Sequence, residues 1–230
     1  MSKNLGSSNK LAGIVILAGG ASRRMVMPKA LLTLPTDERL LDYHVRQAAQ
    51  LNVPIMIADN SRGFTVDAEL LASHLELSIT HIDDYQPISI VDNDKTEGPL
   101  VAIESALQNL NNARDANLEH KSSWLLVISC DSLINANELW QQLSPYIDNN
   151  NIDKSIICLT DQDHLYPLLG LYRLNIEPNL RAYIDSGERK VMSFIKPIAQ
   201  TVTVLEKQQL LTNFNTPTDF KRACSALYEL

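Results

Sequence analysis

The sequence predicts an α/β protein with three layers, αβα, in which helices cover both faces of a mostly parallel, mixed sheet. Three observations favour this class. Short runs rich in Ile, Val and Leu alternate with segments whose apolar residues recur every three or four positions. A glycine pair directly follows the first of these runs. The chain has 230 residues, of which 45% are hydrophobic and 20% charged, values typical of a globular protein.

The first part of the chain repeats a strand–helix pattern. Residues 1–10 are polar and small and predict a mobile tail ahead of a single domain over residues 11–230. The expected strands are continuous apolar runs, and the expected helices carry one apolar face. Asn135 and Glu138 have the spacing of a capping box. In order, the sequence predicts strand 12–18, helix 39–51, strand 54–58, helix 67–75, strand 78–82, helix 99–110, strand 124–129 and helix 135–147.

After residue 151 the alternation changes. Two apolar runs, 155–159 and 168–172, follow each other directly and predict two strands without a helix between them. Two helices and a strand at 202–205 come next. A last helix begins after Thr216 and Pro217, a capping residue followed by proline at the first helical position. This second pattern is why a mixed sheet is expected.

Charge and cysteine content exclude several classes of protein. The net charge is -7, so a dedicated DNA or RNA binder is not expected, because phosphate contacts need a basic face. No apolar run approaches the roughly 18 residues that span a bilayer. The cysteines, Cys130, Cys158 and Cys224, are widely spaced and form no CxxC, which argues against a disulfide framework or a zinc site. A reducing, cytoplasmic setting is the simplest expectation.

The segment 17–25, LAGGASRRM, carries the chemistry. It follows the first predicted strand, where open α/β sheets bind ligands. Gly19 and Gly20 let the backbone approach a ligand and present N–H groups, while Arg23, Arg24 and Lys29 supply positive charge for phosphate oxygens. Neither GxGxxG nor GxxxxGK[ST] is present. The residues alone favour phosphate binding, and a plain turn with solvated arginines is the alternative.

The same segment resembles the opening signature of the molybdenum cofactor guanylyltransferase family (MobA-like). Five later elements resemble motifs of that family in the same order along the chain: Gly98-Pro99-Leu100, Ser129-Cys130-Asp131-Ser132, the strand from Tyr166 to Arg173, the turn from Gly187 to Val191, and the element from Asn213 to Pro217. Each motif alone is weak, but together they span residues 11–220. The resemblance implies a Rossmann-like fold of the nucleotide-diphospho-sugar and nucleotidyltransferase type.

The resemblance also implies an activity. Members of the family transfer GMP from GTP to molybdenum-molybdopterin, forming molybdopterin guanine dinucleotide and releasing pyrophosphate, with Mg²⁺ as cofactor. The N-terminal part of the domain would bind GTP and the C-terminal part molybdopterin. Transient contacts with proteins that deliver the cofactor or receive the product are expected, and neither nucleic acid nor a membrane is an expected partner.

The resemblance assigns roles to individual residues. It implies that Asp131 is the metal ligand. It also implies that Asp131, Arg23 and Lys29, which would contact the triphosphate, are the catalytic residues. The nucleotide is expected at Leu17, Ala18, Gly19, Gly20, Lys29, Asp131, Asn60 (less favoured, Asp59) and Asp84 (less favoured, Asp83). The second substrate is expected at Gly98, Pro99, Tyr166, Pro167, Gly187, Arg189, Lys190, Asn213 and Asn215. Structural alternatives remain open: Asp131 as a turn cap, Lys29 as a surface lysine, and Asn215 or Thr216 as a helix cap.

Four positions depart from the family pattern. Val26 and Pro28 stand where the family usually has glycine and an acidic residue, so the loop over the triphosphate is expected to take a different path. Tyr166 replaces a frequent His, and Leu133 a frequent Pro. Three hypotheses therefore remain: an active GTP-dependent enzyme, a sister enzyme that uses CTP, and a non-catalytic module that binds nucleotide or cofactor.

Overall fold

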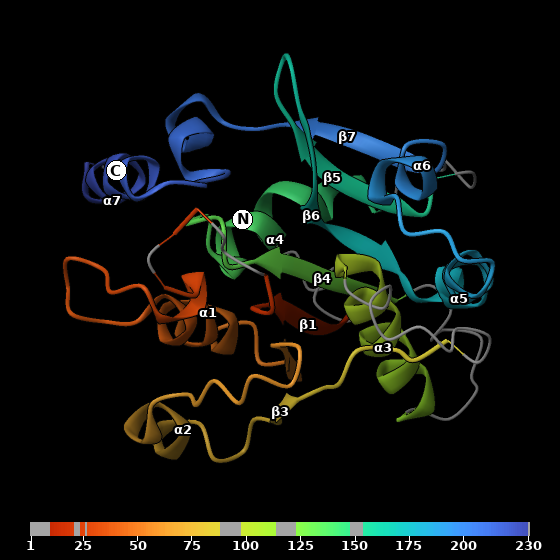
Figure 1. Ribbon diagram of the computed structural model, residues 1–230, viewed down its shortest axis with the longest axis horizontal. Coiled ribbons are helices and arrows are strands. Elements are labelled where there is room, and N and C mark those ends of the chain that lie inside the picture. Colours follow the sequence, from red (N-terminus) through yellow and green to blue (C-terminus); the bar gives the residue numbers. More distant parts are fainter. Residues whose placement is uncertain are drawn as a thin grey trace, which may run out of the picture.

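A seven-stranded sheet forms the middle layer of the protein (Figure 1). The computed structural model describes residues 10–20, 24–25, 27–87, 98–113, 123–147 and 154–229. The predicted tail 1–10 therefore lies, except for Lys10, outside the described residues. The strand order is β3-β2-β1-β4-β6-β5-β7. The strands are β1 (Leu11–Leu17), β2 (Ile55–Ala58), β3 (Ile79–His81), β4 (Trp124–Ser129), β5 (Ile156–Thr160), β6 (Leu165–Arg173) and β7 (Ala199–Thr203).

Strand direction divides the sheet into two parts. β1 pairs in parallel with β2 and β4, and β3 continues the parallel part beyond β2. β6 is antiparallel to both β4 and β5, whereas β7 is parallel to β5. The mixed sheet predicted from the sequence is confirmed. In the register of β1, Leu17 lies opposite both Ala58 and Ser129, so three strands end side by side at one edge.

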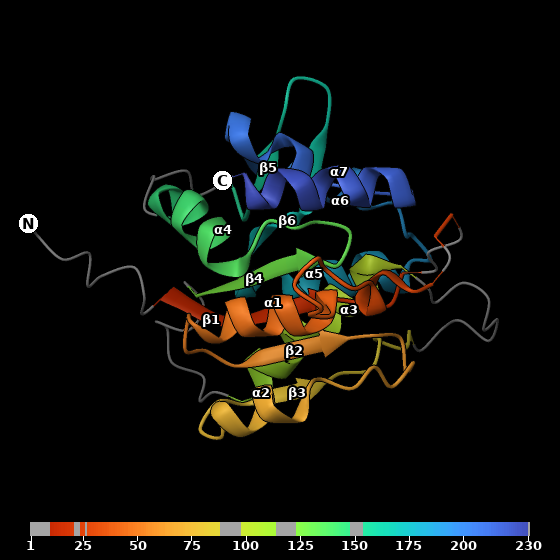
Figure 2. The ribbon, with the colours of Figure 1, turned by 90° about the vertical axis from the view of Figure 1, so that its left-hand side faces the viewer.

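Helices cover both faces of this sheet, as predicted. Figure 2 shows α1, α4 and α7 in front of the sheet, with α3 and α5 behind it. Buried side chains form two apolar clusters, one containing Leu40, Leu139 and Ala223, and the other containing Leu100, Leu180 and Ile195. The α-helices are α1 (Leu40–Ala49), α2 (Ala68–Ser73), α3 (Pro99–Asn112), α4 (Ala136–Leu143), α5 (Glu177–Asp185), α6 (Val191–Ile195) and α7 (Pro217–Tyr228).

Several boundaries differ from those expected. β7 begins three residues before the predicted 202–205 because its ladder with β5 runs from Ala199 to Thr203. Only Val202 of this edge strand is buried, so its apolar pattern is too weak to show its limits. The predicted helix 135–147 is shorter in the structure, because α4 ends at Leu143 and a 3₁₀ turn, Ser144–Tyr146, follows it. Pro145 in this turn has no N–H and cannot donate a helical hydrogen bond. Two further 3₁₀ segments, Lys29–Leu31 and Glu206–Leu211, were not expected.

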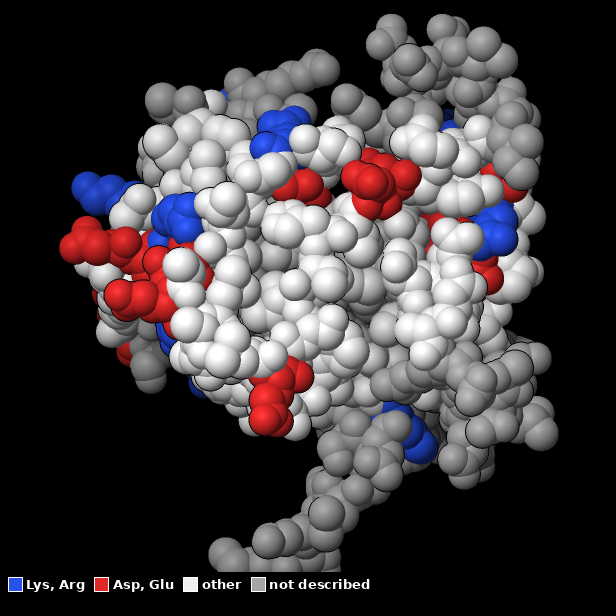
Figure 3. Space-filling view, turned by 90° about the horizontal axis from the view of Figure 1, so that it is seen from below, with Lys and Arg blue, Asp and Glu red and all other residues white. Residues whose placement is uncertain are grey.

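One face of the protein shows how its charged side chains are distributed (Figure 3). Seen from below, on the side of β3 and α2, the Lys and Arg side chains stand apart and form no continuous basic patch among the described residues (Figure 3). Within the described ranges, no helix combines the length and the apolar character needed to cross a bilayer.

One buried ionic cluster joins the two helices behind the sheet. Glu104 of α3 is completely buried, and Arg181 of α5 donates a hydrogen bond of 2.9 Å to its Oε1. Arg181 also forms an ion pair with Glu177 one turn earlier on α5. Burial raises the pKa of Glu104 to about 7, and the hydrogen bond from Arg181 only partly opposes this effect. The α3–α5 contact therefore contains a carboxyl group that titrates near neutral pH.

A Glu104→Gln variant tests this cluster. Because the pKa of Glu104 is higher in the folded chain than its ordinary value of 4.5, its contribution to stability is complete below that value and is lost as pH rises through about 7. Glutamine still accepts from Arg181 but does not titrate. Urea unfolding at several pH values between about 4 and 8 should show the wild type losing stability relative to the variant. Parallel curves for the two proteins would contradict this expectation, and Glu38→Gln, at a surface ion pair, is the control.

Candidate active site

The glycine pair lies where two strands end. After Leu17, the N–H groups of Ala18 and Gly19 both donate to the carbonyl of Ala58, at 2.8 and 3.1 Å. A Cβ atom on Gly19 would lie 2.9 Å from the Cβ of Asn60, so only glycine fits there without displacing the loop after β2. A Cβ on Gly20 would meet no atom within 4 Å, which leaves open space beside its backbone.

A cavity of about 370 Å³, here called the glycine-loop cavity, opens beside this pair. It lies at the carboxyl ends of β1, β2 and β4 and at the N-terminus of α3, the place at which open α/β sheets bind ligands. It is lined by Leu17, Gly19, Gly20, Ala58, Asn60, Asp84, Gly98, Pro99, Ala102, Ser129, Asp131 and Leu168.

Two pairs of adjacent polar residues lie near this cavity, and in each pair one residue lines the cavity while the other accepts a hydrogen bond from the protein. Asp59 is buried, and its Oδ2 accepts from the N–H of Phe64 at 2.8 Å, so its carboxylate holds the turn. Asn60, with a left-handed φ of 55°, lines the cavity instead. Likewise, Asp83 accepts from the hydroxyl of Ser61 at 3.0 Å, whereas Asp84 lines the cavity. The favoured residue of each predicted pair is therefore the one that lines the cavity.

A second cavity of about 290 Å³, the lysine cavity, adjoins the first. Its walls include Arg24, Lys29, Asp131 and Asn215. The Lys29 Nζ donates to the carbonyl of Phe214 at 2.6 Å and to Oδ1 of Asn215 at 3.1 Å, and lies 4.0 Å from Asp131 Oδ2. Partial burial lowers the pKa of Lys29, and the nearby Asp131 carboxylate opposes the shift.

Lys29 is therefore not a solvated surface lysine, and its contacts come from the turn after β4 and from the segment before α7. Pro28 precedes it in an extended conformation and leads into the 3₁₀ turn that carries it. Arg23 and Val26 lie outside the described residues, so the predicted contribution of Arg23 and the expected effect of Val26 on this loop stay predictions.

A third cavity of about 210 Å³, the tyrosine cavity, holds part of the predicted second-substrate site. Tyr166, Pro167 and Asn213 line it, together with Asp131, Leu165, Leu168, Leu169, Val191, Met192 and Thr212. The hydroxyl of Tyr166 donates a hydrogen bond to Asp161. Gly187, Arg189 and Lys190 line none of these three cavities. Arg189 instead donates to the carbonyls of Ile184 and Glu188, at the end of α5.

Asp131 is the residue that these three cavities share. It follows the buried strand β4, and its side chain is 32% exposed, so a rigid element presents a partly solvated carboxylate. Its main-chain carbonyl accepts from the N–H of Phe214 at 2.8 Å. Asp131 therefore lines all three cavities, and its role as a metal ligand stays a prediction.

Two residues of α1 brace the turn after Asp131, and the sequence did not point to them. The hydroxyl of Tyr43 donates to the carbonyl of Leu133 at 3.1 Å. His44 is completely buried, and its Nε2 lies 3.0 Å from the carbonyl of Ser132. Because a carbonyl only accepts, Nε2 carries the proton. Burial lowers the pKa of His44 to about 4, so the ring is neutral at pH 7. Nothing in the helical periodicity distinguishes these side chains from ordinary helix residues.

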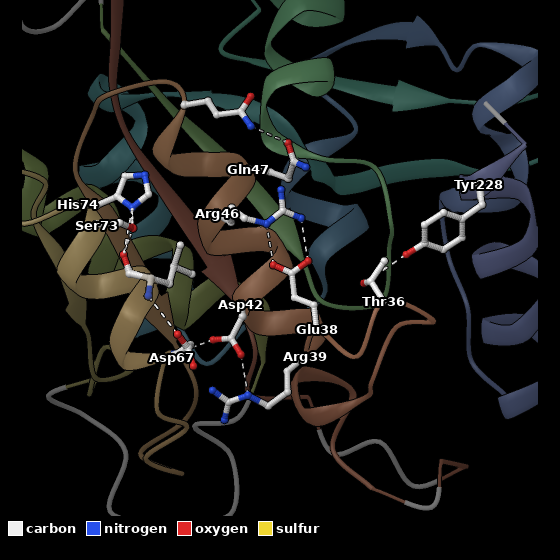
Figure 4. Close-up of polar contacts among 12 residues, drawn as sticks. Thr36, Glu38, Arg39, Asp42, Arg46, Gln47, Asp67, Ser73, His74 and Tyr228 are labelled. Carbon is white, nitrogen blue, oxygen red and sulfur yellow. Dashed lines mark hydrogen bonds and ion pairs between the residues drawn. The ribbon is translucent and has the colours of Figure 1, made fainter.

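A larger groove of about 1030 Å³ lies elsewhere, between α1, α2 and the end of α7 (Figure 4). Its cationic side chains are already paired: Arg46 donates twice to Glu38, at 2.7 Å each, and Arg39 donates to Asp42 at 2.6 Å. No glycine and no strand end line it. The smaller cavities around Asp131 are therefore the better candidates for catalysis.

Alanine at the two glycines should separate packing from ligand space. Gly19→Ala should destabilise the protein by about 1–3 kcal/mol, because its Cβ would meet Asn60 at 2.9 Å. Gly20→Ala should change stability by less than about 0.5 kcal/mol, since that position is open. Urea unfolding of the two variants checks this, and equal losses at both positions would contradict it.

The buried histidine should make the protein sensitive to acid. Its pKa of about 4 in the folded chain lies below the ordinary 6.5, so the unfolded chain binds more protons between these values. The contribution of His44 to stability is complete above 6.5 and falls as pH decreases toward 4, by up to roughly 3 kcal/mol. His44→Gln, which retains an N–H donor, should flatten this part of the stability curve. Unfolding at stepped pH measures the slopes, and equal slopes would show that His44 is not the cause.

The chain is similar to one protein family and to curated proteins of known name. The profile of the MobA-like NTP transferase domain family matches residues 14–203. A probable molybdenum cofactor guanylyltransferase of Synechococcus elongatus is 28% identical over 210 residues, which are 90% of this chain and 95% of that protein. A molybdenum cofactor guanylyltransferase of Vibrio atlanticus is 24% identical over 207 residues, 88% of this chain and 90% of that protein.

Solved structures agree on the fold. Molybdopterin-guanine dinucleotide biosynthesis protein A from Archaeoglobus fulgidus superposes with a TM-score of 0.65 at 20% identity, covering 95% of this chain and all of that chain. The 4-diphosphocytidyl-2C-methyl-D-erythritol synthase from Anaerococcus prevotii gives 0.55 at 10% identity, covering 95% of this chain and 96% of that chain. The family profile covers most of the chain, including most of the sheet and the strand ends that form the cavities around Asp131. This chain therefore belongs to the MobA-like NTP transferase domain family.

Proposed function

We propose that this protein is a molybdenum cofactor guanylyltransferase. It transfers GMP from GTP to the terminal phosphate of molybdenum-molybdopterin and releases pyrophosphate. The observation that carries the proposal is the position of Asp131, whose carboxylate borders all three cavities and lies 4.0 Å from the ammonium of Lys29. The names of the curated relatives support the same activity.

The nucleoside occupies the glycine-loop cavity in this proposal. The backbone of Gly20 approaches the base and ribose, because the space where a Cβ would stand is open, and Gly19 lines the same cavity. The Asp84 carboxylate accepts from the N1–H and N2–H₂ of guanine, which selects guanine over adenine. Asn60 contributes a second polar contact from the neighbouring strand end.

The phosphates extend into the lysine cavity, where Lys29 and Arg24 line the wall. Phosphoryl-type transfer needs little covalent help and depends on positioning and on neutralising charge at phosphate oxygens. Lys29 supplies a fixed positive charge there. Leu17 and Ala18 complete the wall beside Gly20.

The residues around Asp131 fit Mg²⁺ in particular. Among the described residues, no group of three or more His, Cys, Asp or Glu side chains comes together as an all-protein metal cage. Mg²⁺ is usually held by one or two carboxylates together with substrate phosphates and water, which a single partly exposed aspartate can provide. When bound, the ion neutralises charge on the phosphates, and Asp131 would hold it.

Molybdopterin occupies the tyrosine cavity. Tyr166 and Pro167 offer it an apolar wall, and Asn213 offers an amide that both donates and accepts. Its terminal phosphate approaches the α-phosphorus of GTP from the side opposite the leaving pyrophosphate. Gly98 and Pro99 line the neighbouring glycine-loop cavity. The reaction runs in the cytoplasm, where GTP is available, with other proteins handing over the labile cofactor.

Dinucleotide formation tests the proposal directly. Purified protein is supplied with Mg²⁺, metal-loaded molybdopterin, and GTP or CTP in parallel. Product with GTP alone is expected, and Asp131→Asn should lower its rate by at least about 100-fold. Asp83→Asn is the matched control, because Asp83 bonds Ser61 and lies outside the cavity walls.

Other outcomes assign other functions. Product with CTP alone would make the protein a cytidylyltransferase. No product with either nucleotide, from folded protein and beside a working enzyme, would favour the non-catalytic module, and glycine and aspartate at Val26 and Pro28 would then be tested for rescue. Unchanged turnover by the Asp131→Asn variant would overturn the metal assignment.

A further inference from the structure

The ammonium of Lys29 is held from the opposite end of the chain. It donates to the carbonyl of Phe214 at 2.6 Å and to Oδ1 of Asn215 at 3.1 Å. The ring of Phe214 also lies below it, with 5.4 Å between Nζ and the ring centroid. Both hydrogen-bond acceptors are uncharged, so they orient the ammonium without cancelling its charge, whereas the Asp131 carboxylate stays at 4.0 Å.

The chemistry of these groups fixes the orientation of two amides. An ammonium only donates, so Asn215 must turn its oxygen toward Lys29. Its Nδ2 then faces Asn213 and donates to Oδ1 of that residue at 3.1 Å. Asn213 is exposed and lines the tyrosine cavity. A chain of two amides therefore runs from the tyrosine cavity to the lysine.

The backbone around Asn215 is fixed before any ligand arrives. Asp219 Oδ2 accepts from the N–H of Asn215 at 3.4 Å and from that of Thr216 at 3.0 Å, as part of the capping box of α7. Phe214 is completely buried, and its N–H is bonded to the carbonyl of Asp131. Little conformational entropy is lost when this segment holds the lysine, because α7 and the β4 turn already order it.

We infer that Asn215 is a positioning residue of the nucleotide side: it holds the ammonium of Lys29 beside Asp131, and Asn213 sets the orientation of its amide. The resemblance to the family had placed both asparagines on the molybdopterin side. The inference rests on the proposed function for the identity of the nucleotide, but the contact between Asn215 and Lys29 can be tested without any substrate.

The first test uses the protein alone. Acylation of Lys29 by a water-soluble anhydride is followed by mass spectrometry at one fixed pH. Asn215→Leu removes an acceptor that holds the ammonium at 3.1 Å, so the ammonium should be released into the cavity more often and acylation should accelerate several-fold. Thr218→Val, three residues further along at an exposed position of α7, should leave the rate unchanged. An unchanged rate in the Asn215→Leu variant would overturn the inference.

The second test measures the affinity for Mg²⁺-GTP by calorimetry. Asn215→Leu should weaken binding several-fold, because Lys29 would then have to be ordered when the nucleotide binds. Asn215→Asp should weaken it as well, because a carboxylate would cancel the charge of Lys29. Combined with Lys29→Met, Asn215→Leu should add almost nothing, since both changes remove one interaction.

Each result has a distinct meaning. Independent, additive losses in the double variant, or a raised KM for molybdopterin with unchanged GTP affinity, would return Asn215 to the second-substrate site and overturn the inference. Wild-type protein that binds neither GTP nor CTP would refute the proposed function. In that case the acylation rates alone decide for or against the contact between Asn215 and Lys29.

Discussion

The parallel pairing of β1 with β2 and β4 is the constraint on which the site depends. Its register sets Leu17 beside Ala58 and Ser129, so the loops that follow all leave the sheet at one edge. Gly19 then packs against Asn60, and Asp131 emerges two residues after Ser129. A slip of register would separate these groups, because the cavities lie between the strand ends.

Segments distant in sequence help to order the catalytic edge. Tyr43 and His44 brace the turn after β4 from one side, and Phe214 bonds Asp131 from the other. Lys29 reaches across the chain to the residues before α7. Such support keeps charged groups in position before substrates bind, which is the arrangement that electrostatic catalysis requires.

Much of the fold and the central site could be predicted from the sequence, because apolar runs, a glycine pair and motif order carry that information. The rest depends on tertiary contacts. Asp59 and Asn60 are adjacent, and only the hydrogen bond from the N–H of Phe64 shows that the side chain of Asp59 is structural. The brace at His44 has no sequence signal, since a buried histidine looks like any polar helix residue. Arg189 is predicted at the second substrate, and its Nη1 donates to two main-chain carbonyls, a contact that no sequence pattern indicates.

The sharing of Asp131 by adjoining cavities has a consequence for inhibitor chemistry. A nucleoside fragment and a heterocyclic fragment that each bind weakly to separate cavities could be joined by a short linker across this aspartate. The second fragment would then meet its cavity at a millimolar effective concentration, so the joined compound gains affinity without a new contact. The linker must be short, because Asp131 lines both cavities.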